Sequence, residues 1–121
     1  MRYQQDYILR QIEMLVQFVA RLAFGREPEA YCIADAQALT DADRLWRQLV
    51  ERIAQGDYNG GEDLLFEQFV PEPAYLAVAM DFYQRLSALS DEDLERGDFT
   101  REEVLDGLET LVRQYGIDPA I

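Results

Sequence analysis

The stretch that decides the fold is IAQGDYNGGEDLLFEQF, residues 53–69, because a similar phrase, LERGDFTREEVLDGL, returns at residues 94–108. In both phrases a Gly-Asp-aromatic triplet separates two segments whose apolar residues recur at helical spacing. Gly permits the left-handed conformation that ends a helix, Asp accepts hydrogen bonds from the free amides of the turn, and the aromatic ring packs between the two helices. We therefore predict a helix-turn-helix hairpin that occurs twice, with a period of 41 residues.

Start and stop signals divide the rest of the chain into further helices. Thr40 or Asp41 is expected to cap one helix, Asn59 and Ser90 two more, and Thr100 with Glu103 forms a capping box before the last. No alternating run typical of a β-strand and no linker interrupts the sequence, so we predict one all-α domain, residues 1–121, of about five to seven helices. The helical segments expected are residues 4–24, 30–39, 41–55, 60–69, 74–89, 91–96 and 101–115.

The expected first helix, residues 4–24, has more apolar surface than one packing partner covers. Two interpretations follow: a central helix of a monomer, or a helix that self-associates in a homodimer. Residues 1–26 carry a net charge of +2 and the remainder −15, so this helix is attracted to an acidic body, either its own or that of a sister subunit. The apolar seam that forms the candidate interface consists of Ile8, Ile12, Leu15, Val19 and Leu22.

The overall charge restricts the partners that the chain is expected to bind. The sequence holds 24 acidic and 11 basic residues, a net charge of −13, which repels nucleic-acid phosphates and anionic lipid headgroups. The opening residues have no features of a secretion signal, and no uncharged run reaches the ~18 residues of a membrane span. We therefore expect a cytoplasmic protein that binds neither nucleic acid nor membrane.

Few residues are candidates for chemistry, so we expect no enzyme and no cofactor. The sequence has no His, which leaves no partner to activate a Ser or Cys nucleophile, and Cys32 is expected to be a small buried residue on a helix. A calcium pattern at Asp91, Asp93, Glu95 and Glu102 has Arg96 where the loop requires Gly. We interpret these acids as helix caps rather than metal ligands.

Two resemblances accompany these patterns. The paired Gly-Asp-aromatic turns resemble those of tetratricopeptide-like hairpins, although the period of 41 exceeds the ~34 residues of that repeat. The segments QDYILRQIEMLVQFVARLAFGR, residues 5–26, and NGGEDLLFEQF, residues 59–69, are similar to a family of short uncharacterised helical proteins from low-GC Gram-positive bacteria, a domain of unknown function. That resemblance implies a helical fold and brings no activity or functional residue.

These observations favour an all-α fold in which tetratricopeptide-like hairpins pack with a hydrophobic N-terminal helix. The function we expect is non-enzymatic protein-protein interaction, through a groove between the hairpins that takes a helix or an extended segment. The alternative is a homodimeric structural protein that self-associates through its N-terminal helix. In either case the partner is another protein or a second copy of the chain.

Overall fold

The computed structural model describes residues 2–119, with side chains from residue 5 onward. The described chain is all-helical, as predicted, and has no strand. Pro73 occupies the first turn of α4, where its missing N–H costs nothing, and Gly116 ends α6 in the left-handed conformation. The helices are α1 (Arg2–Phe24), α2 (Asp41–Ala54), α3 (Tyr58–Gln68), α4 (Pro73–Ser87), α5 (Asp91–Arg96) and α6 (Arg101–Tyr115).

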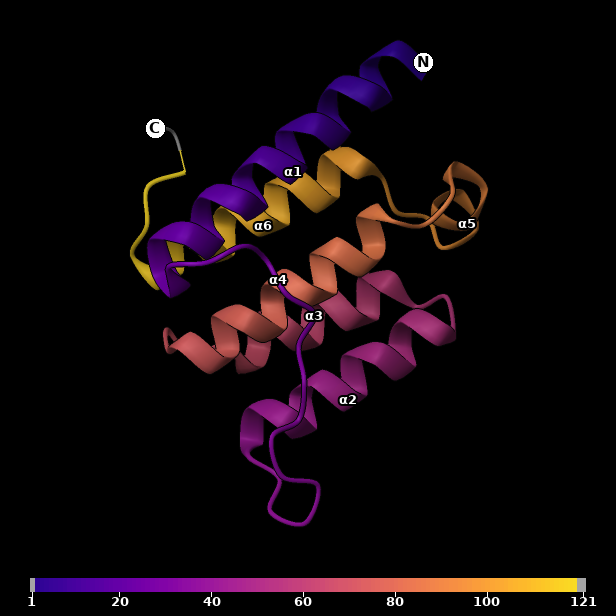
Figure 1. Cartoon of the computed structure of the whole chain (residues 1–121). Coiled ribbons are helices and arrows are strands. Elements are labelled where there is room, and N and C mark those ends of the chain that lie inside the picture. Colours follow the sequence, from indigo (N-terminus) through magenta and orange to yellow (C-terminus); the bar gives the residue numbers. More distant parts are fainter. Residues whose placement is uncertain (1, 120–121) are drawn as a thin grey trace.

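Helix α4 is the centre of the fold and packs against α1, α2 and α6 (Figure 1). Its buried residues, which run from Leu76 to Leu86, occur on almost every side of the helix, a pattern typical of a helix enclosed by others. Each large apolar side chain enclosed there contributes about 1.5–3 kcal/mol by leaving water. The central position therefore belongs to α4, while α1 lies on the outside against α6 and α4.

The two Gly-Asp-aromatic turns lie against each other. The rings of Tyr58 and Phe99 meet edge to face with centroids 6.4 Å apart, and both side chains are buried. The side-chain amide of Asn59 donates to the backbone oxygens of Gly97 and Asp98, at 3.3 and 3.1 Å. The repeated phrase therefore forms one contact that joins the α2–α3 hairpin to the α5–α6 turn.

The two turns differ in backbone conformation. Gly56 has φ +75°, as expected for the end of α2, but Gly97 has φ −89°, and Asp98 takes the left-handed conformation with φ 54°. Gly97 is required for space: a Cβ there would lie 2.3 Å from the Tyr58 ring and 2.9 Å from the Gly56 oxygen. The prediction of a left-handed glycine is thus right for the first turn and wrong for the second.

Two further expectations are corrected by the structure. Residues 30–39 form no helix: they belong to the strap, the name we give to the irregular segment 25–40 between α1 and α2. Helix α3 starts at Tyr58, one residue before the expected cap Asn59, because the Asp57 carboxylate accepts the Gly60 amide at 3.0 Å. Thr40 and Thr100 cap α2 and α6 as expected.

We expect Gly97→Ala to lower the free energy of unfolding by about 1–3 kcal/mol, because the new methyl group overlaps the Tyr58 ring. Urea titration followed by Trp46 fluorescence measures this loss. In a Tyr58→Ala background the same substitution should cost clearly less, since the ring has gone. Gly25→Ala is the control: it has φ +69° and open space around it, so its cost of about 1 kcal/mol should not change with residue 58. An equal cost of Gly97→Ala in both backgrounds would contradict the contact.

Candidate functional site

A groove made of three adjoining hollows follows α1. The first hollow, of about 610 Å³, lies where α5 and α6 meet Gln5; the second, of about 460 Å³, lies between the middle of α1 and the end of α4; the third, of about 230 Å³, lies between the end of α1, the strap and α4. Arg101 lines both the first and the second hollow, and Pro28 both the second and the third. The three together form the α1 groove.

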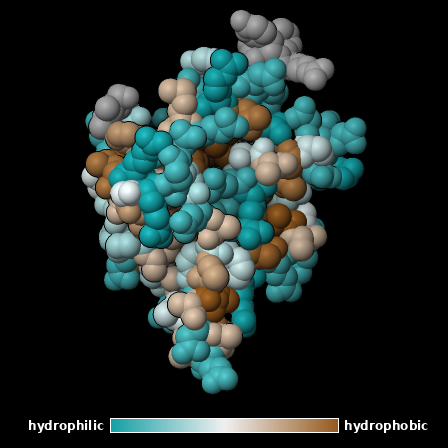
Figure 2. Space-filling model, in the orientation of Figure 1, coloured by the Kyte–Doolittle hydropathy of each residue, from teal (hydrophilic) through white to brown (hydrophobic). Residues whose placement is uncertain are grey.

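The walls of the α1 groove change in character from one end to the other. Four carboxylates line the first hollow, namely Asp91, Glu95, Asp98 and Glu102. The second and third hollows combine apolar side chains with polar ones, which include Glu13 and Arg101 in the second and Arg26, Glu27 and Glu29 in the third. Figure 2 shows apolar side chains at the surface of one face of the molecule, between hydrophilic ones. The apolar residues are Leu9, Ile12, Val16, Pro28, Ala88 and Leu89 in the second hollow and Ala20, Phe24, Pro28, Ala30, Ala77 and Met80 in the third.

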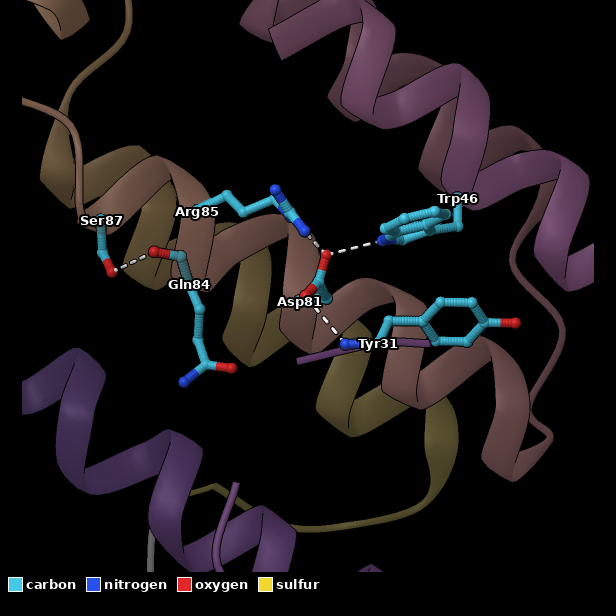
Figure 3. A network of polar contacts seen from close by, with 6 residues as sticks. All are labelled: Tyr31, Trp46, Asp81, Gln84, Arg85 and Ser87. Carbon is cyan, nitrogen blue, oxygen red and sulfur yellow. Dashed lines mark hydrogen bonds and ion pairs between the residues drawn. The ribbon is translucent and has the colours of Figure 1, made fainter. Parts of the chain in front are cut away.

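Asp81 holds the strap, which supplies one wall of the third hollow, against α4 (Figure 3). This carboxylate is buried and accepts three hydrogen bonds: from the Tyr31 amide at 3.0 Å, the Trp46 indole N–H at 2.8 Å and the Arg85 Nε at 2.6 Å. The Arg85 guanidinium also lies 5.6 Å above the Trp46 ring. A buried charge with this many donors is well compensated, so the strap has a defined position.

A second contact fixes the same part of the strap to α2. The Tyr31 hydroxyl donates to Asp43 at 2.5 Å, and Asp43 also accepts the Thr40 amide at 2.9 Å. Burial and the neighbouring Asp43 carboxylate raise the pKa of Tyr31 to about 12, and the Tyr31 hydrogen bond lowers the pKa of Asp43. The Tyr31 amide and hydroxyl are thus bound to α4 and α2 rather than to groups of their own segment, which is not helical.

Arg101 separates the first hollow from the second. Its guanidinium is buried, donates to the Leu89 backbone oxygen at 2.6 Å and pairs with Asp91, while its Nε has no hydrogen-bond partner among the described residues. This side chain therefore ties the α4–α5 connection to the start of α6.

The residues of the predicted helix-one interface fall into two groups. Ile12, Leu15 and Val19 are buried within the chain's own core, and Ile8 packs against that core. Leu22 is 58% exposed, and two other apolar residues on the same side of α1, Tyr7 and Met14, are exposed at 61% each. The sequence showed too wide an apolar surface on this helix, but the spacing alone did not reveal which side faces outward.

The position and exposure of Cys32 differ from the prediction. It was predicted to be buried on a helix, but it is exposed in the strap, at the edge of the third hollow. Its neighbour Tyr31 faces the core side of the strap through its bonds to Asp81 and Asp43, which alternation in an extended segment explains. The thiol is therefore accessible to a probe.

A second polar cluster, outside the α1 groove, joins α3, α4 and α6. Burial raises the pKa of Glu62, which accepts the Tyr83 hydroxyl at 2.6 Å, and Tyr83 in turn has a raised pKa because it is buried. A Cβ at Gly107 would lie 2.2 Å from the Glu62 oxygen, so this glycine makes room for the pair. The Glu62 carboxylate and the Tyr83 hydroxyl are thus hydrogen-bonded to each other. The described residues contain no group of three or more acidic or Cys side chains placed to hold a metal ion.

We expect Asp81→Asn to release the strap, because an amide offers one acceptor oxygen where the carboxylate receives three donors. The free energy of unfolding should fall by about 1–3 kcal/mol, the cost of leaving buried donors unpaired. Hydrogen exchange of the Tyr31 amide should accelerate, and the emission of Trp46, the one Trp of the sequence, should change. Asp41→Asn is the control, since its exposed pair with Arg44 contributes little. Wild-type exchange at Tyr31 in the Asp81→Asn variant would show that Asp81 does not hold the strap.

Comparison with known proteins gives one match. A family model described as a family of unknown function (DUF6483) matches residues 2–116. No curated protein and no solved structure matches, so the tetratricopeptide-like shape of the hairpins stays a prediction. Among the described residues no helix has the length and apolar content needed to cross a membrane. Because the match extends over nearly the whole chain, this protein belongs to the family of unknown function DUF6483.

Proposed function

We propose that this chain is a non-enzymatic protein-protein interaction domain whose α1 groove receives a segment of a partner protein. The observation that carries the proposal is the succession of the three hollows along α1, in which Arg101 lines the first and the second and Pro28 the second and the third. The groove follows α1 from Gln5 to Phe24, which is roughly 28 Å of helix at ~1.5 Å per residue. That length matches about eight residues of extended chain.

The rigidity of the groove walls supports the same proposal. Asp81 and Asp43 hold the strap, and Arg101 holds the other end of the groove. Because the groove is already formed before a ligand binds, binding loses no conformational entropy in ordering the groove walls, which favours a higher affinity. The mixture of an apolar floor with polar rim residues such as Gln17 and Gln84 suits a peptide, whose backbone needs hydrogen-bond partners.

Filling the second hollow should abolish partner binding. Ala88 is exposed and lines this hollow, so Ala88→Trp puts a large side chain into it while the core stays intact. Ala74→Trp is the matched control, because Ala74 is exposed at the start of α4, the helix that Ala88 caps at its other end, and lines none of the three hollows. In affinity capture from cells that express the protein, quantified by mass spectrometry, the expected result is a set of proteins retained by wild type and Ala74→Trp and reduced at least tenfold with Ala88→Trp. Equal capture by all three would refute the groove as the binding site.

A second candidate function is self-association, favoured by the outer stripe of α1, which we define as Tyr7, Met14 and Leu22. These residues are 61%, 61% and 58% exposed. Their spacing of seven and eight is nearly symmetric, so an antiparallel second copy would place Tyr7 opposite the partner's Leu22 and the two Met14 side chains near the twofold axis. The face used would be the outer stripe rather than the buried part of the predicted seam.

If the outer stripe mediates a homodimer, light scattering should give twice the monomer mass, and Met14→Glu with Leu22→Glu should give a folded monomer. Two copies with a charge of −13 repel each other, so dimerisation should strengthen as salt screens that repulsion. Gln17→Glu, also exposed on α1, serves as the charge control. A monomer mass at every protein and salt concentration would exclude this function.

A further inference from the structure

We infer that the segment received by the α1 groove is basic at one end and apolar at the other, with the basic end in the first hollow and a large apolar side chain in the third. This inference rests on the proposed function and adds the chemistry and the orientation of the partner segment. It follows from the unequal distribution of charge along the groove. The lining of each hollow determines which kind of side chain the hollow favours.

The first hollow favours a cation. Among the described residues of its lining, four carboxylates face one guanidinium, that of Arg101, which gives these residues a net charge of −3. Arg101 pairs with Asp91, and among the described side chains none forms an ion pair with Glu95, Asp98 or Glu102. These three exposed carboxylates are left for Arg or Lys side chains of a partner.

One effect acts against a cation at this place, and it is smaller. Helix α6 begins at Arg101, and a helix N-terminus carries roughly half a positive charge. Three unneutralised carboxylates outweigh it, and the net charge of −13 for the whole chain adds attraction at longer range. The balance therefore favours a basic segment over an acidic one.

The second and third hollows favour apolar side chains. In the second, Leu9 and Val16 of α1 stand opposite Leu89 at the end of α4, with Glu13 as the one acidic residue of that lining. The third has the smallest volume of the three; Phe24 and Met80 form part of its apolar lining, and Arg26, Glu27 and Glu29 also line it. The apolar part of a small hollow of this kind takes one anchoring side chain, which typically contributes most to the affinity.

The distance between the hollows sets the order of residues in the partner. The first and third hollows touch α1 at Gln5 and at Ala20 to Phe24, about 15–19 residues apart or roughly 22–28 Å. An extended chain covers that distance in about six to eight residues. The basic residues and the apolar anchor should therefore be separated by that number of positions.

A library of random 12-residue peptides displayed on their own mRNA tests both the groove and the orientation. Selection uses the wild-type chain, Ala88→Trp and Ala74→Trp in parallel. The expected peptides are retained by wild type and Ala74→Trp, are lost with Ala88→Trp, and carry Arg or Lys at one end and a large apolar residue about six to eight positions away. Their binding should weaken as salt increases.

Charge variants of the first hollow test whether the basic end of the peptide binds there. Binding of a selected peptide should weaken about fivefold in the double variant Glu95→Gln with Glu102→Gln, as expected for the loss of two exposed ion pairs. The double variant Asp63→Asn with Glu67→Gln removes two exposed charges of α3 that line none of the hollows, and it should leave affinity within about twofold. Equal losses in both would mean that only the overall charge matters, and would overturn the placement of the basic end.

Cys32 reports the orientation, since it is the one Cys of the sequence and is exposed beside the third hollow. A nitroxide attached to it should broaden the NMR signals of the apolar end of a bound peptide and spare the basic end. Broadening of the basic end would overturn the orientation. Selected peptides without a basic end would overturn the inference and leave the groove function standing, whereas peptides that bind Ala88→Trp as well as wild type would overturn both.

Discussion

The contact between the two Gly-Asp-aromatic turns is the constraint on which the rest of the structure depends. Tyr58 can lie against the second turn because Gly97 has no side chain, and Asn59 then satisfies two backbone oxygens of that turn. The contact joins residues about 40 positions apart, so it sets how the α2–α3 hairpin lies against α6. Once these two parts are joined, the apolar faces of α2 and α6 both meet α4, which explains why α4 is the enclosed helix.

The α1 groove is a consequence of the same arrangement. Helix α1 packs on α6 and reaches α4 only in part, so a furrow remains between α1 and the end of α4. The strap crosses from α1 to α2 and closes one end of this furrow, and Asp81 gives it a defined place. The groove therefore combines an apolar floor set by helix packing with walls set by buried polar contacts. A long irregular segment with such specific anchoring is typical of a functional loop.

The candidate site was only partly accessible from the sequence. The apolar excess of the first helix was correctly recognised, yet apolar spacing alone could not separate the buried Val19 from the exposed Met14. Residues 30–39 of the strap were predicted to be helical, whereas the partners that hold Tyr31, Asp81 and Asp43, lie outside the strap in the sequence. Cys32 was misplaced with it. Three acidic residues of the first hollow, Asp91, Glu95 and Glu102, were interpreted as helix caps, and the sequence did not show that they line one space together with Asp98.

What the sequence by itself determined is what depends on neighbours a few residues apart. The helix starts after Thr40, Ser90 and Thr100 follow from capping side chains, so they were predicted correctly, and so was the all-α class. The tertiary structure alone decided that α4 is central, that Asp98 rather than its neighbouring glycine is left-handed, and that the groove exists. These features depend on contacts between distant residues, whose energies exceed local preferences and are not encoded in any single segment.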